Sequence, residues 1–230
     1  MIEGIVGNLS QVRIEIQEAC QRSGRSLNEI TLVAVCKGFP AEAIIEASTQ
    51  GGQKVFGENY LKEGAEKIMQ LADLELSWHF LGHLQRNKAR KVASLFSLIH
   101  SVDSLELGWV LSEEGQRRER LVPCLLEVNL GLEASKSGFL PEQLPQAQSL
   151  FKAPGLDVHG LMAIPPAGTI EAARRYFRTL RILRDDLSER LGRSLPVLSM
   201  GMSDDYPIAI EEGATLVRVG RAIFGPRRRR

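Results

Sequence analysis

Apolar residues follow two patterns along this chain, and each predicts a different kind of element. Near the start they recur three or four residues apart, at Ile5, Leu9, Val12, Ile16 and Cys20. This spacing is typical of an amphipathic helix, and Gly24 is a suitable end for it. A second apolar stripe runs through residues 171–191, just before Gly192, and predicts another long helix.

Eight short apolar runs alternate with helical stretches and predict eight strands. The runs cover residues 31–37, 54–57, 77–82, 96–101, 122–129, 157–163, 195–200 and 215–220. Such alternation produces right-handed βαβ units and a parallel sheet, and eight units close into a (β/α)₈ barrel. We therefore predict an α/β fold: one TIM-type barrel domain over residues 1–230 with an extra N-terminal helix. An open, doubly wound sheet is the alternative.

Composition and charge narrow the functional classes. The 230 residues carry a net charge of +1, so no global field favours nucleic acid. The run Arg227–Arg230 is an exception that indicates either a solvated tail or a contact for a polyanion. Three cysteines without paired spacing favour a reducing compartment. Because the sequence has neither a long apolar run nor a signal-peptide pattern, we expect a cytoplasmic protein without membrane contact.

The first predicted strand ends on a lysine, within the stretch LVAVCKGFP. Side chains alternate along a strand, so Val33, Val35 and Lys37 share one face while Cys36 lies on the other. If the first face is the barrel interior, Lys37 reaches the mouth, where the active groups of barrels gather. A partly buried amine is more nucleophilic, which suits a Schiff base. The alternative is a solvated lysine in the following loop.

Glycine-containing loops follow the last two predicted strands. The segment SMGMSDD combines Gly201 with the hydroxyls of Ser199 and Ser203, and the next residues can start a helix with free N–H groups. The last strand runs into VRVGRAIFG, where Gly220 permits close backbone approach and Arg221 supplies charge. Barrels often bind phosphate with the loops after strands seven and eight, so these loops predict a phosphate site.

Arg218 stands between two valines on the last predicted strand, on the same face as Leu216. An arginine on a central strand needs a partner. The two candidates are a barrel carboxylate and the anionic group or ring nitrogen of a bound aromatic cofactor. A lysine on the first strand, a phosphate site on the last two and an arginine beside it together predict pyridoxal 5′-phosphate (PLP).

These residues lie in stretches that resemble the pyridoxal phosphate homeostasis proteins, the single-domain relatives of the alanine racemase barrel. The matching stretches are LVAVCKGFP, FGENYLKE, WHFLGHLQRNKAR, IHSVDS, SKSGF, HGLMAIPP, LSMGMSDDYPIAIEEGATLVRVG and AIFG, in this order between residues 32 and 225. The resemblance implies a modified barrel that carries PLP on Lys37 and acts in the intracellular homeostasis of vitamin B6.

The resemblance also implies which residues form the pocket. It puts phosphate contacts on Ser199 and the Gly220 turn, and Arg218 near the pyridine nitrogen. Asn59 and His79 would line the wall. The other implied cofactor contacts are Met162, Met200, Gly201 and Arg221.

Two positions differ from the usual pattern of that family. It often has serine in place of Cys36, and threonine or serine in place of Arg221. Cys36 should face away from the cofactor. The second difference leaves open whether the side chain of Arg221 or only its backbone N–H holds the phosphate.

Two functions remain open at this point. The first is a PLP-binding protein with little or no turnover and no catalytic residue, a monomer rather than a dimer, with amino or keto acids as further ligands. The alternative is a PLP-dependent amino-acid racemase of the alanine racemase fold. Such racemases add a β-domain and a second base. This chain ends soon after the last predicted strand, and of Tyr60, Tyr176 and Tyr206 we expect only Tyr60 near the mouth.

A metal site is not predicted. His79 and His83 are four residues apart, as two ligands on one helix face would be. The glutamate that follows the first histidine in zinc proteases is absent, and no third ligand is evident in the sequence.

Overall fold

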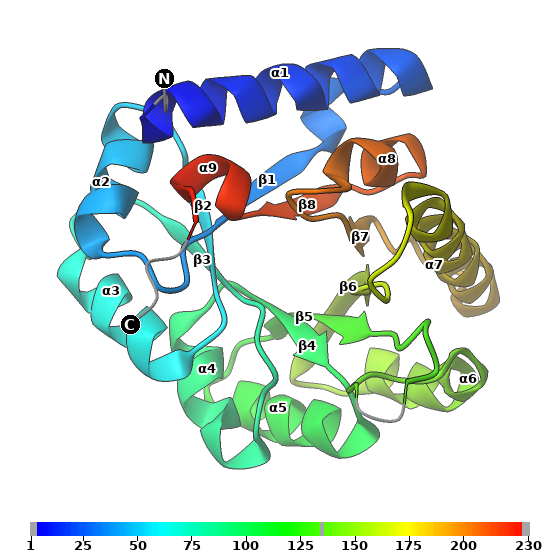
Figure 1. The fold of residues 1–230 in the computed structure, drawn as a ribbon. Coiled ribbons are helices and arrows are strands. Elements are labelled where there is room, and N and C mark those ends of the chain that lie inside the picture. Colours follow the sequence, from blue (N-terminus) through cyan, green and yellow to red (C-terminus); the bar gives the residue numbers. More distant parts are fainter. Residues whose placement is uncertain (1–3, 134–135, 227–230) are drawn as a thin grey trace.

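Eight parallel strands close into a barrel in the computed structural model, which describes residues 4–133 and 136–226 (Figure 1). The strands are β1 (Thr31–Val35), β2 (Val55–Glu58), β3 (Ser77–Phe80), β4 (Leu98–Val102), β5 (Val122–Glu127), β6 (Leu156–Met162), β7 (Val197–Ser199) and β8 (Leu216–Val219). Each strand pairs with the next in sequence, and β8 pairs with β1, with Leu32 opposite Val217. The predicted eight-stranded barrel is confirmed.

Helices surround the barrel (Figure 1). They are α1 (Ile5–Ser23), α2 (Ala41–Thr49), α3 (Leu61–Gln70), α4 (Ala89–Leu95), α5 (Leu105–Arg117), α6 (Leu144–Ala147), α7 (Ile170–Leu191), α8 (Tyr206–Glu211) and α9 (Arg221–Phe224), with short 3-10 turns at Leu27–Glu29, Arg86–Lys88, Pro141–Gln143 and Gln148–Lys152. Both predicted long helices, α1 and α7, are confirmed. They end at Gly24 and Gly192, whose φ angles of 66° and 61° suit glycine. The extra helix α1 packs against α8 and α9.

Alternation along the strands separates two apolar layers. Val33, Leu125 and Leu216 belong to a small cluster inside the barrel, whereas Ala34 and Cys36 belong to the larger layer between barrel and helices. The predicted inward face of the first strand is therefore confirmed. However, β1 ends two residues earlier than predicted, so Lys37 lies in a turn at the mouth of the barrel.

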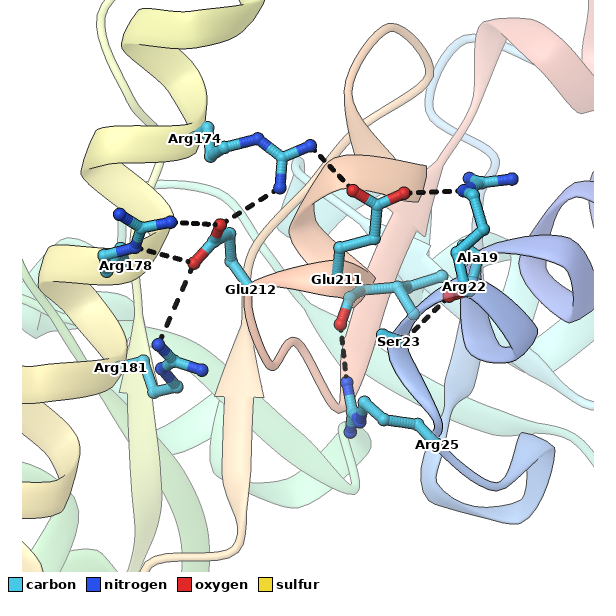
Figure 2. Close-up of polar contacts among 10 residues, drawn as sticks. Ala19, Arg22, Ser23, Arg25, Arg174, Arg178, Arg181, Glu211 and Glu212 are labelled. Carbon is cyan, nitrogen blue, oxygen red and sulfur yellow. Dashed lines mark hydrogen bonds and ion pairs between the residues drawn. The ribbon is translucent and has the colours of Figure 1, made fainter.

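A network of arginines and glutamates ties α1, α7 and α8 together (Figure 2). Glu212, which is only 4% exposed, accepts hydrogen bonds from Arg174 and Arg178 of α7 at 3.0–3.1 Å. Glu211 bridges Arg174 to Arg22 of α1, with contacts of 2.7 and 2.8 Å. Burial acts to raise the pKa of Glu212, but the hydrogen bonds from Arg178 and Arg174 outweigh it and hold the pKa below its ordinary value.

We expect Glu212→Gln to lower the free energy of unfolding by about 2 kcal/mol, the scale of a lost charged hydrogen bond. A carboxylate with a depressed folded-state pKa stabilises the fold above its ordinary pKa, and that contribution is lost as the pH falls. The difference in the free energy of unfolding between wild type and variant should therefore shrink in acid. Urea titrations at neutral and acidic pH measure it. Glu113→Gln, at an exposed position of α5, is the control; an equal loss in both variants would contradict the expectation.

No helix within residues 4–133 and 136–226 combines the length and apolarity needed to cross a membrane. The run Arg227–Arg230, singled out in the sequence, lies outside the described residues.

Candidate cofactor-binding site

A cavity of about 460 Å³ opens at the mouth of the barrel. Its lining brings together five of the predicted contacts: Lys37, Asn59, Arg218, Gly220 and Arg221. They come from the ends of β1, β2 and β8 and the turns that follow them, which is where a barrel collects its functional groups. A volume within about 300–1,000 Å³ is usual for a small-molecule site.

Backbone N–H groups converge on Ser203 at one side of this cavity. Its Oγ accepts hydrogen bonds from the N–H groups of Gly220 and Ala222, both at 3.3 Å. A Cβ at position 220 would lie 3.0 Å from the carbonyl oxygen of Val35, so glycine lets the turn pass close to β1. The side chain of Arg221 is 63% exposed and pairs with Asp204. Both N–H groups are therefore paired with Ser203, and the lining here also carries the carboxylate of Asp204 beside the guanidinium of Arg221.

Arg218 is 5% exposed and points to the barrel interior. Its Nη1 donates to Ser199 Oγ at 2.5 Å, and its Nη2 donates to the carbonyl oxygen of Ala163 at 3.0 Å. Burial lowers the pKa of Arg218 to about 10, against the raising influence of Glu127 and Asp205. The side chain therefore remains a cation at neutral pH, held by a hydroxyl and a carbonyl.

A chain of hydrogen bonds runs from Arg218 into the barrel. Ser199 Oγ lies 2.9 Å from His100 Nδ1, and His100 Nε2 lies 3.0 Å from His79 Nδ1. Because a guanidinium only donates, Ser199 Oγ accepts from Arg218, and the direction of the other two contacts is set by which nitrogen of His100 carries the proton. Burial lowers the pKa of His79 to about 4, and burial, then His79 and Arg218, lower that of His100 well below its usual range. Both rings are therefore neutral.

The other five predicted contacts, His79, Met162, Ser199, Met200 and Gly201, lie below or beside the cavity and not on its lining. Ser199 is fully buried in the hydrogen-bond chain with His79, and Met162 packs inside the barrel. Met200 packs in the outer apolar layer. The glycine of the same loop, Gly201, has a φ of 90°, and a Cβ there would lie 2.6 Å from the Cβ of Ala209. Its carbonyl oxygen accepts from the N–H of Arg218 at 3.0 Å.

Sequence reasoning missed two residues near the site, and it placed a third in the phosphate loop without choosing it as the contact. His100 and Glu127 were not singled out, and Ser203 was noticed only as one of two hydroxyls in its loop. Glu127 shares the inward face of β5 with Leu125, so strand alternation could have found it. Burial and the nearby carboxylate of Asp103 raise the pKa of Glu127 to about 7, while Arg218 lowers it.

Asn59, at the end of β2, carries an unsatisfied group at the cavity. Its Oδ1 is buried and has no hydrogen-bond partner in the described part of the chain. A buried amide oxygen without a partner is costly, so this position favours a ligand that donates a hydrogen bond.

The two histidines of the HFLGH stretch do not come together as metal ligands. His79 is buried against His100, whereas His83 is exposed and lies 3.1 Å from Asp103. Among the residues that the structure describes, no group of three or more His, Cys, Asp or Glu side chains is arranged to hold a metal ion.

The chain is similar to known proteins over almost its whole length. Residues 8–228 match the family described as "Alanine racemase, N-terminal domain". The "Pyridoxal phosphate homeostasis protein" of Pseudomonas aeruginosa is 48% identical over 227 residues, covering 97% of this chain and 96% of the relative. The protein of that name from Aquifex aeolicus is 43% identical over 222 residues, covering 96% and 97%.

Two solved structures are also similar to this chain. PipY of Synechococcus elongatus PCC7942, solved with PLP bound, superposes with a TM-score of 0.84 at 34% identity, covering 96% of this chain and all of PipY. An alanine racemase from Clostridium difficile 630 reaches a TM-score of 0.74 at 15% identity, covering 96% of this chain and 57% of the racemase. The second likeness concerns the fold alone.

Proposed function

The chain belongs to the pyridoxal phosphate homeostasis proteins, within the family of the alanine racemase N-terminal domain, and from this we propose that it binds PLP and regulates its supply with little or no turnover. The observation that carries the proposal is the cavity at the barrel mouth, which joins the amine of Lys37, the buried cation of Arg218 and the Ser203–Gly220 turn.

The residues of the cavity fit the groups of PLP. We assign the phosphate to the turn of Ser203, Gly220 and Ala222, where the hydroxyl proton of Ser203 would donate to it; the two N–H groups would reach it only by leaving Ser203 Oγ. The cationic Arg218 suits an unprotonated ring nitrogen, and the unsatisfied Oδ1 of Asn59 offers an acceptor. We propose that Lys37 condenses with the aldehyde, forming a C=N bond and releasing one water molecule.

Two features of the site favour binding over catalysis. When bound, PLP supplies a ring that withdraws electrons, most strongly with a protonated ring nitrogen. Arg218 disfavours that proton because both charges are positive.

A second base near the bound cofactor has no evident source among the tyrosines. The hydroxyl of the buried Tyr206 donates a hydrogen bond to Glu15, Tyr60 is 61% exposed in a neighbouring groove, and Tyr176 lies on α7. None of these three lines the cavity at the barrel mouth within the described residues. An amino-acid racemase is the alternative function.

Incubation of the PLP-loaded protein with L-alanine in deuterated water separates the two functions. We expect PLP to bind at one equivalent in equilibrium dialysis, while chiral chromatography detects no D-alanine and mass spectrometry detects no α-deuterium beyond a protein-free PLP control. Stoichiometric binding together with racemisation at catalytic rates would move the protein to the enzyme class.

A further inference from the structure

A cluster of buried charges lies behind Lys37, on the outer side of the barrel wall. Glu58 ends β2 and is 0% exposed, while Lys67 of α3 is 5% exposed. Lys67 Nζ lies 2.5 Å from Glu58 Oε1 and 2.8 Å from Glu63 Oε1. Buried charges are costly unless they are paired and hydrogen-bonded, and here each has a partner.

This cluster holds the peptide group on each side of Lys37. Lys67 Nζ donates to the carbonyl oxygen of Cys36 at 2.7 Å, in the peptide group that precedes Lys37. Glu63 Oε1 accepts from the N–H of Gly38 at 2.6 Å, in the peptide group that follows. The ammonium of Lys67 thereby uses all three of its donors, two on carboxylates and one on the lysine loop.

The sheet cannot supply this restraint. The strand β1 ends at Val35, and the last backbone bond toward β2 is the one from Cys36 N–H to the carbonyl oxygen of Gly57, at 3.0 Å. Immediately after Lys37, Gly38 adopts a φ of 79°, a turn conformation. The turn is closed by its own hydrogen bond, from the N–H of Phe39 to the carbonyl oxygen of Cys36 at 3.1 Å, and α3 adds the side-chain contacts that hold this turn from outside the barrel sheet.

We propose that Lys67, Glu63 and Glu58 are positioning residues, which fix the backbone of Lys37 so that its amine meets the cofactor aldehyde in a productive geometry. This inference rests on the proposed function. It assigns the cluster no contact with the cofactor itself. Its expected consequence is kinetic, because misplacing a reacting group by about 1 Å can slow a reaction by up to about a hundredfold.

Glu63→Ala and its neighbour Glu66→Ala form a matched pair of variants. Both remove a carboxylate from α3, but only Glu63 holds the N–H of Gly38, whereas Glu66 is exposed. Lys67→Met serves as a second test. Two measurements are made: the rate of Schiff-base formation with PLP, by absorbance, and the dissociation constant of pyridoxine 5′-phosphate. That compound has an alcohol in place of the aldehyde and cannot react with Lys37.

We expect Glu63→Ala and Lys67→Met to form the Schiff base about tenfold more slowly than wild type. Both should bind pyridoxine 5′-phosphate within about twofold of wild type, because the phosphate turn is untouched. Glu66→Ala should match wild type in both measurements. If Lys67→Met does not fold because Glu58 is left without its partner, Glu63→Ala decides alone, since the side chain of Glu63 is 29% exposed.

Three other outcomes would overturn the inference. Equal rates in Glu63→Ala and Glu66→Ala would remove the role of the Gly38 contact. Parallel losses for both ligands would make the cluster a support of the fold and not of Lys37. A wild-type protein whose borohydride-reduced adduct lies on another lysine would overturn the proposed role of Lys37, and the positioning role would fall with it.

Discussion

Lys37→Ala is expected to eliminate the covalent adduct between this protein and PLP. The substitution removes the amine at the cavity and leaves the phosphate turn and Arg218 in place. Because Lys37 is half-buried in a turn, its truncation should leave the barrel folded. Non-covalent binding of PLP should therefore persist, more weakly, while the absorbance of the Schiff base disappears completely.

Borohydride reduction followed by peptide mass mapping measures this effect. Wild type should carry one reduced adduct, on Lys37, and Lys37→Ala should carry none. Lys62→Ala is the control, because Lys62 is an exposed lysine on α3; its adduct should equal that of wild type. An undiminished adduct in Lys37→Ala, or one that maps to Lys136, would show that another amine captures the cofactor.

The sequence predicts the framework of this protein well because the framework depends on local patterns. Alternation puts Val33 and Val35 on one face and Cys36 on the other, and the structure shows that the first face is the barrel interior. Strand ends are less accurate: β1 stops at Val35 and not at Lys37, because the chain turns away after the backbone bond of Cys36 to Gly57. Such an end depends on a partner strand, which local pattern does not specify.

The support of the site depends on contacts between distant parts of the chain, and these are not visible in the sequence. Lys67 looks like any polar residue of an amphipathic helix, yet it is buried against Glu58 and the carbonyl oxygen of Cys36, 31 residues earlier. His100 lies 99 positions from Ser199, its partner. Both residues owe their roles to barrel closure, so only the three-dimensional arrangement identifies them.

Ser199 and Ser203 show the same limit within a single loop. The sequence offered both hydroxyls to the phosphate, and the resemblance favoured Ser199, which stays a prediction. In the structure Gly201, with its φ of 90°, turns the chain between the two serines. Ser199 is left in the buried chain with Arg218 and His100, while Ser203 lies on the cavity lining beside the N–H of Gly220.

Ser203→Ala is therefore expected to weaken the binding of PLP by about tenfold to a hundredfold and to leave the binding of pyridoxal nearly unchanged. The scale follows from the loss of one charge-assisted hydrogen bond, roughly 1.5–3 kcal/mol. Ser199→Ala should instead weaken both ligands by a similar factor, because it removes a partner of Arg218, which we assign to the ring and not to the phosphate.

Dissociation constants of PLP and pyridoxal, measured for both variants by titration, distinguish the two serines. The ratio of the two dissociation constants is insensitive to general damage to the fold, because such damage weakens the binding of both ligands alike. Ser10→Ala, at an exposed position of α1, is the control and should leave the ratio unchanged. If Ser199→Ala changes the ratio and Ser203→Ala does not, the phosphate is held deeper in the barrel. A hydroxyl has one proton to donate, so Ser199 would then donate it to the phosphate and not to His100, while its Oγ still accepts from Arg218.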